Sequence, residues 1–75
     1  MKHVLIKFEQ ADQIINFVRI INRYDYEADI KCGSRIVDAK SIVGVLSLAK
    51  AKTVELILHT EECGKLLEEI APYAA

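Results

Sequence analysis

The chain has 75 residues, of which 52% are hydrophobic and 28% charged, and its formal net charge is −1 at pH 7. This length is below the size at which a chain divides, so we expect one domain over residues 1–75. The interspersed charges exclude the basic surface that nucleic-acid binding requires, and no apolar run approaches the length of a membrane span. The two cysteines, Cys32 and Cys63, are too few and too far apart for a disulfide framework or a zinc cluster. We expect a cytoplasmic protein with reduced, buried thiols that binds no metal, cofactor, nucleic acid or membrane.

The first third of the chain is predicted to form a strand followed by a helix. Residues 2–8 alternate between apolar and other side chains, which indicates a strand covered on one face. After a polar joint, apolar residues recur at helical spacing between Asp12 and Arg23 and predict a helix with a broad buried face. Its buried positions should be Ile14, Phe17, Val18 and Ile21.

A hairpin is predicted next. Residues 27–32 alternate again, and Gly33-Ser34 is typical of a two-residue hairpin turn. Residues 35–39 should therefore return as a short antiparallel strand. The inward side chains of the first strand of this hairpin should be Ala28, Ile30 and Cys32.

A short helix is predicted within residues 40–49. Ser41 stands directly before the apolar run, where a hydroxyl accepts a hydrogen bond from the first free amides of a helix. One helical face of the run is expected to enter the core, while the other stays exposed unless a partner covers it. The first face carries Val45 and Leu48, and the second carries Ile42, Val43 and Leu46. The pattern indicates either a docking surface with a switch at its edge or plain core packing with an ordinary cap.

The remaining residues predict a strand and a final helix. Residues 53–59 alternate cleanly, with inward positions at Val54, Leu56 and Leu58. Thr60, followed by Glu61 and Glu62, predicts the helix N-terminus, because a hydroxyl can cap it and carboxylates favour the positive end of the helix dipole. Pro72 should end the helix.

This order of strand, helix, strand, strand, helix, strand and helix predicts an α/β (α+β) protein. Because one sheet face alternates to polar residues, all three helices should cover the other face of an antiparallel sheet, as in an open-faced sandwich. Periodicity alone equally allows a ferredoxin-like arrangement.

The segment Lys-Ser-Ile-Val-Gly-Val-Leu-Ser-Leu at residues 40–48 resembles the regulatory serine segment of HPr. HPr is the small histidine-containing phosphocarrier of the bacterial phosphoenolpyruvate-dependent sugar phosphotransferase system. Arg23-Tyr24-Asp25 and Ala28-Asp29 resemble the entry to the second strand of that family, and residues 52–58 fall where the family has its last strand. The resemblance implies a four-stranded sheet in the order first, fourth, second, third.

The histidine loop of HPr-like carriers has no counterpart here. Counted back from Tyr24, the phosphorylated histidine of the family falls on Gln10, its arginine on Asp12 and its proline on Gln13. A glutamine amide has no nucleophilic nitrogen, and a carboxylate at residue 12 would repel a phosphate. We therefore expect a protein that is neither a histidine phosphocarrier nor an enzyme.

The resemblance instead directs attention to Ser41. In Gram-positive relatives the matching serine is phosphorylated from ATP by a dedicated kinase, and the product is a co-repressor partner of a transcriptional regulator. A phosphate on Ser41 would add charge beside an apolar anchor formed by Ile42, Val43 and Leu46, with Lys40 as a neighbouring counter-charge.

Two other interpretations use the outer face of the sheet. Leu5 and Ile57 lie on that face and indicate an interaction or oligomerisation domain, such as a weak homodimer. His3 and His59 should lie near one another at the end of the sheet away from Gln10. They could act as an alternative phosphate carrier or a metal pair, although surface histidines at strand ends are the simpler interpretation.

Overall fold

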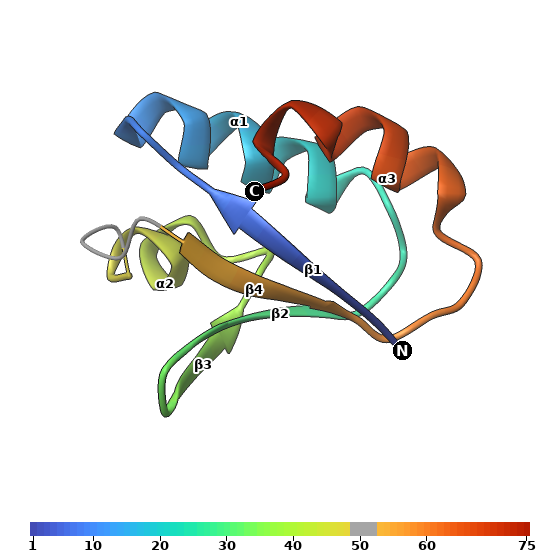
Figure 1. Ribbon diagram of the computed structural model, residues 1–75, viewed down its shortest axis with the longest axis horizontal. Coiled ribbons are helices and arrows are strands. Elements are labelled where there is room, and N and C mark those ends of the chain that lie inside the picture. Colours follow the sequence, from blue (N-terminus) through green and yellow to red (C-terminus); the bar gives the residue numbers. More distant parts are fainter. Residues whose placement is uncertain (49–52) are drawn as a thin grey trace.

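The computed structural model describes residues 1–48 and 53–75 and contains the predicted elements in the predicted order (Figure 1). They are β1 (Lys2–Lys7), α1 (Ala11–Asn22), β2 (Ala28–Cys32), β3 (Arg35–Asp38), α2 (Ile42–Leu46), β4 (Thr53–Leu58), α3 (Gly64–Ile70) and a final 3-10 turn, η1 (Ala71–Tyr73). Ala49, the last residue of the segment 40–49, and Lys52, the first residue of the segment 52–58, lie outside the described residues.

The strands form one antiparallel sheet in the order β1-β4-β2-β3, with β1 and β3 at its edges. This is the order expected from the resemblance, and it replaces the ferredoxin-like alternative. Gly33 has a φ of +62° at the first position of the β2–β3 turn, which suits a residue without a Cβ. The turn fixes the hairpin register, in which Cys32 pairs with Arg35.

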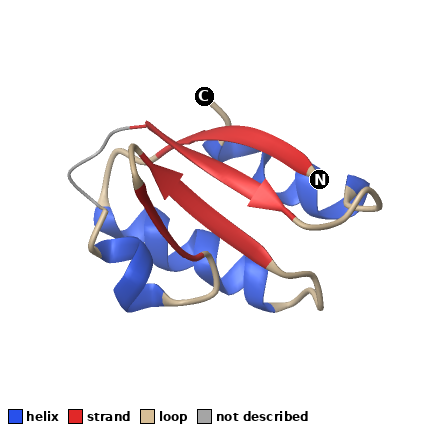
Figure 2. Ribbon diagram, turned by 90° about the horizontal axis from the view of Figure 1, so that it is seen from below, coloured by secondary structure: helices blue, strands red, loops and turns tan. Residues whose placement is uncertain are grey.

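The helices share one side of the sheet, as predicted. Figure 2 shows the strands in front of the helices, so the face toward the viewer carries none of the described helices. The stripe on α1 faces the sheet, and each of its four predicted core residues is at most 2% exposed. Phe8, just beyond β1, meets Phe17 edge to face, with ring centroids 5.2 Å apart. Hydrophobic burial on this side therefore holds a helix that is rich in poor helix formers.

The start of the last helix differs from the prediction. α3 begins at Gly64 with Cys63 as its N-cap residue, and Thr60 lies before it. The Thr60 hydroxyl instead accepts a hydrogen bond from the Glu62 amide at 3.2 Å, closing a local turn. Cys63 is only 1% exposed, so packing of its thiol in the core moves the first helical turn beyond the acidic residues. α3 ends at Ile70, and Pro72 lies in η1, as expected.

The two thiols are free, but only Cys63 is buried. Cys32 is half-buried at the end of β2, because the hairpin turn leaves it at the margin of the core. The prediction that both thiols are buried was therefore wrong for Cys32.

The chain ends beside β1. The Ala75 amide donates to the Leu5 carbonyl at 2.9 Å, and Ala74 bridges to Ile6. Part of the edge of β1 is thus already paired within the chain. None of the helices in residues 1–48 and 53–75 is long and apolar enough to cross a membrane.

Candidate functional site

Ser41 is the N-cap residue of α2, as predicted. Its backbone is extended, with φ −97° and ψ 111°, and its Oγ accepts a hydrogen bond from the Gly44 amide at 3.1 Å. The Ser41 carbonyl accepts from Val45 at 2.9 Å, which closes the first helical turn. The side chain is half-buried at the edge of the helix. The hydroxyl therefore satisfies an amide that the helix itself leaves free.

Gly44 leaves room for this cap. A Cβ at Gly44 would lie 3.3 Å from the Ser41 Oγ, which is closer than most such contacts, and 3.4 Å from the Val37 Cβ. The glycine therefore lets the hydroxyl reach its amide while α2 packs against β3.

The residue before the cap is held from several directions. The Lys40 amide donates to Asp38 Oδ1 at 2.9 Å, and its carbonyl accepts from Asn22 Nδ2 at 3.0 Å. Its ammonium donates to the Tyr24 carbonyl at 2.8 Å. The structure thus ties Ser41 to a well-anchored loop, and the Lys40 charge is directed toward the end of α1. Its role as a counter-charge for a phosphate stays a prediction.

The outer surface of α2 is apolar beside the cap. Val43 is 81% exposed and Ile42 40%, while Val45 and Leu48 are buried, as the helical pattern predicts. Leu46 differs from the expectation, because it is half-buried and packs against the core. The exposed anchor beside Ser41 is therefore formed by Ile42 and Val43, with Leu46 at its base.

An arginine that sequence reasoning did not connect to this region lies at the other end of α2. Arg35 donates to the Ser47 Oγ at 3.3 Å, and the Ser47 hydroxyl donates to the Gly44 carbonyl. The alternation of β3 was the available signal, since Arg35 pairs with inward-facing Cys32 and must lie on the helix side of the sheet.

The start of α1 is arranged differently. Gln10 is its exposed N-cap residue, and the Gln13 Oε1 accepts from the amides of Glu9 at 2.6 Å and Gln10 at 3.4 Å. Asp12 adds a carboxylate in the first turn. The Gln13 side chain thus binds the backbone just before the helix, and the Asp12 carboxylate places a negative charge where a phosphate would approach the first turn.

The two histidines lie at the end of the sheet away from Gln10, as expected, but each has its own carboxylate partner. His3 Nδ1 lies 2.9 Å from Glu55 Oε2, and His59 Nε2 lies 2.7 Å from Asp29 Oδ2. Within the described part of the chain, no group of three or more histidine, cysteine, aspartate or glutamate side chains could hold a metal ion. The arrangement is that of separate cross-strand pairs.

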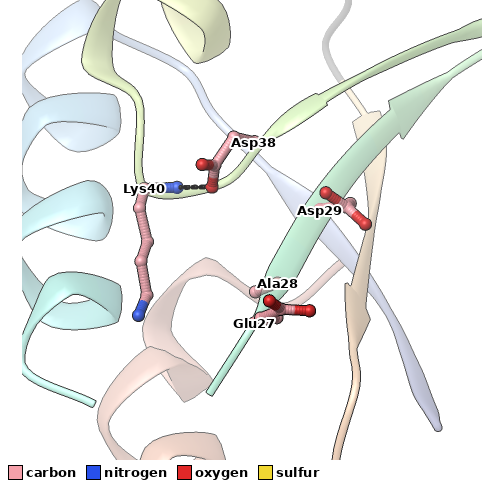
Figure 3. Close-up of a pocket in the computed structure, with 5 residues that line it drawn as sticks. All are labelled: Glu27, Ala28, Asp29, Asp38 and Lys40. Atoms are coloured by element: carbon pink, nitrogen blue, oxygen red, sulfur yellow. Dashed lines mark hydrogen bonds between the residues drawn. The ribbon is translucent and has the colours of Figure 1, made fainter. Parts of the chain in front are cut away.

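A polar pocket lies at the β2 and β3 ends of the sheet. Its lining is Glu27, Ala28, Asp29, Asp38 and Lys40 (Figure 3). In Figure 3 the Lys40 side chain extends away from the Asp38 carboxylate, while its backbone nitrogen makes the hydrogen bond described above. The carboxylates of this pocket are not gathered on one point, and one of them is paired with His59.

Comparison with known proteins finds similarity to HPr and related proteins. The family model for the PTS HPr component phosphorylation site matches residues 10–74. Three solved structures are similar over most of both chains. HPr-C-His from Thermoanaerobacter tengcongensis is 22% identical, with a TM-score of 0.78, and the match covers 96% of this chain and 89% of that one.

The other two structures are closer in sequence. Phosphocarrier protein HPr from Bacillus anthracis is 28% identical, with a TM-score of 0.74 and coverage of 99% and 94% of the two chains. Crh from Bacillus subtilis, a catabolite repression containing protein that forms a dimer with a swapped domain, is 33% identical. Its TM-score is 0.67, with coverage of 91% and 80%. No curated protein matches the sequence significantly.

Proposed function

Because the chain belongs to the PTS-HPr family, we propose that it is a cytoplasmic regulatory protein of the phosphotransferase system and not a histidine phosphocarrier. It would act by binding protein partners, without a catalytic reaction of its own. Phosphorylation of Ser41 by an HPr-type serine kinase would control that binding, and a transcriptional regulator would be the partner.

The contrast between two helix starts carries this proposal. Ser41 presents a hydroxyl at the edge of exposed Ile42 and Val43, whereas Gln10 offers no nucleophile and has Asp12 beside it. In the proposed reaction the Ser41 Oγ gives its proton to a base of the kinase and bonds to the γ-phosphorus of ATP. The bond between that phosphorus and the β–γ bridging oxygen breaks, and ADP leaves. The product places a dianion at the start of α2, where the free amides and the helix dipole favour it.

The test is phosphorylation in two separate reactions, one with phosphoenolpyruvate and enzyme I and one with ATP and the HPr serine kinase. Intact and peptide masses then locate any phosphate. We expect one phosphate, from ATP only, on Ser41. Ser41→Ala should lose it, and Ser47→Ala, which removes a hydroxyl from the other end of α2, should retain it. Phosphate on Ser47, or acid-labile phosphate on His3 or His59, would contradict the proposal.

A second candidate function is self-association through the helix-free face of the sheet, as a weak homodimer. The exposure of Leu5, which is 57%, favours it, and Ile57 lies half-buried on the same face. Leu5→Glu should abolish a concentration-dependent increase in mass, whereas a protein that stays monomeric at all concentrations would exclude this function.

A further inference from the structure

The helix-free face of the sheet carries its side chains in rows that cross all four strands. The strand register places Leu5 of β1 beside Glu55 of β4, Glu55 beside Lys31 of β2, and Lys31 beside Ile36 of β3. From one edge to the other, this central row therefore reads apolar, acidic, basic, apolar. No described helix covers it, as Figure 2 shows.

The members of the central row are available to a partner. Leu5 is 57% exposed and Ile36 is 59% exposed, at opposite edges of the sheet. Lys31 is exposed, and no carboxylate of the described residues lies within ion-pair distance of its ammonium. Glu55 instead contacts His3 diagonally. The row thus ends in two uncovered apolar side chains and holds an ammonium that lacks an ion pair among the described residues.

We infer that this face binds a second copy of the chain, face to face, about a two-fold axis parallel to the strands. Such an axis keeps the row at its height and reverses its direction, so β1 faces the β3 of the second copy. Leu5 then meets the Ile36 of the second copy, and Glu55 meets its Lys31. Because the contact is two-fold, each of these pairs forms twice. Two sheets that pack in this way lie about 10 Å apart, within reach of all four side chains.

The charges select this axis over the other possible one. A two-fold axis perpendicular to the strands would place Glu55 against Glu55 and Lys31 against Lys31, which is repulsive. In the neighbouring row, formed by His3, Ile57, Asp29 and Asp38, the parallel axis places His3 opposite the Asp38 of the second copy, which is favourable, and Ile57 opposite its Asp29, which adds no attraction. Asp29 is held within each copy by His59.

The size of the face sets the strength of the dimer. Four strands spaced about 4.8 Å apart and six residues long at about 3.3 Å each give a face of roughly 400 Å². Two such faces bury less than the roughly 1,200–2,000 Å² of a stable interface, so association should begin only at about 0.1–1 mM. This inference rests on the proposed self-association and is independent of Ser41.

The experiment uses two opposite charge reversals, Lys31→Glu and Glu55→Lys. In each single variant the residues at 31 and 55 that face one another across the dimer carry the same charge. Its mean mass in sedimentation equilibrium at about 1 mM should therefore lie clearly below that of the wild type, with association weakened at least about tenfold. An equimolar mixture should associate at least as well as the wild type, because each row then meets its complement. The double variant K31E/E55K should associate like the wild type. Lys65→Glu on α3 is the matched control, because it makes the same charge change outside this face and should leave association unchanged.

The outcomes distinguish a failure of the two-fold geometry from a failure of self-association itself. If the wild type associates but the mixture does no better than the single variants, the two-fold geometry is wrong while self-association stands. If the wild type stays monomeric at about 1 mM, the two-fold geometry and the self-association both fail, because even a face of this size should form some dimer at that concentration. Far-ultraviolet circular dichroism and thermal unfolding of each variant, unchanged from the wild type, exclude loss of the fold as the cause.

Discussion

The starts of α1 and α2 are each held by a side chain that accepts hydrogen bonds from backbone amides, but the two side chains differ in chemistry. At α1 the Gln13 side chain accepts from the amides of Glu9 and Gln10, just before the first helical turn, and Asp12 adds a carboxylate to that turn. At α2 a single hydroxyl, that of Ser41, accepts from Gly44 and lies beside exposed apolar residues. An amide cap is chemically inert, whereas a hydroxyl cap can gain a phosphate without removal of the residue that starts the helix. Two similar backbone sites can thus differ entirely in the reaction they allow.

The largest expected effect is a gain of histidine phosphorylation at the start of α1. It shows whether a missing nucleophile is the only reason that this site takes no phosphate. Gln10→His should gain no phosphate from phosphoenolpyruvate and enzyme I, because Asp12 and the Gln13 cap remain. A triple variant, Gln10→His, Asp12→Arg and Gln13→Pro, should become detectably phosphorylated on histidine by intact mass. Rapid phosphorylation of the single variant would show that Asp12 and Gln13 do not matter.

Removal of each cap should distinguish the two helix starts by stability. Ser41→Ala should lower the free energy of unfolding by about 1 kcal/mol, the usual loss for a hydroxyl N-cap, in urea unfolding at pH 7. Gln13→Ala should cost less, because one of its two hydrogen bonds is long, at 3.4 Å, and both are exposed. Equal losses would mean that the two caps are equivalent.

Gly44 and Gly64 offer a matched pair of glycine substitutions. Alanine is favoured over glycine in a helix by up to about 1 kcal/mol, and a Cβ at Gly64 would have nothing within 4 Å. Gly64→Ala should therefore raise the unfolding midpoint. Gly44→Ala should lose that gain, since its Cβ would lie 3.3 Å from the Ser41 Oγ. An increase in the unfolding midpoint for Gly44→Ala as large as that for Gly64→Ala would show that the Ser41 side chain can move aside without loss of stability.

The smallest expected effect is on stability and comes from the ion pair of Glu61, just before α3. The N-terminal ammonium donates a hydrogen bond to Glu61 at 2.6 Å, and this bond, with the charge of the ammonium, lowers the pKa of the Glu61 carboxyl. Since the pKa is lower in the folded protein, the pair stabilises it above about pH 4.5, the ordinary value for this carboxyl, and the contribution is lost as the pH falls through the lowered pKa.

Comparison of Glu61→Gln with the wild type checks this effect. The difference between their urea midpoints should be small at pH 7, because the pair is exposed, and it should vanish near pH 2. A difference that persists there would assign it to packing and not to charge.

Sequence patterns predicted most of the fold because burial follows periodicity. Alternation identified β1, β2 and β4, and the helical stripe identified the four core residues of α1. The Ser41 cap was predictable for the same reason, since a hydroxyl before an apolar run has a local role. The start of α3 was not predictable in this way, because Thr60 satisfies every local rule for an N-cap while burial of Cys63 decides where the helix begins.

The sequence by itself determined the order of the elements and the cap at Ser41, because these depend on side-chain chemistry and local spacing. Only the tertiary structure decided which carboxylates meet His3 and His59, that Arg35 reaches Ser47, and that Leu5, Glu55, Lys31 and Ile36 share one row. Those relations join strands far apart in the chain, and the register that sets them follows from packing of the whole sheet against its helices.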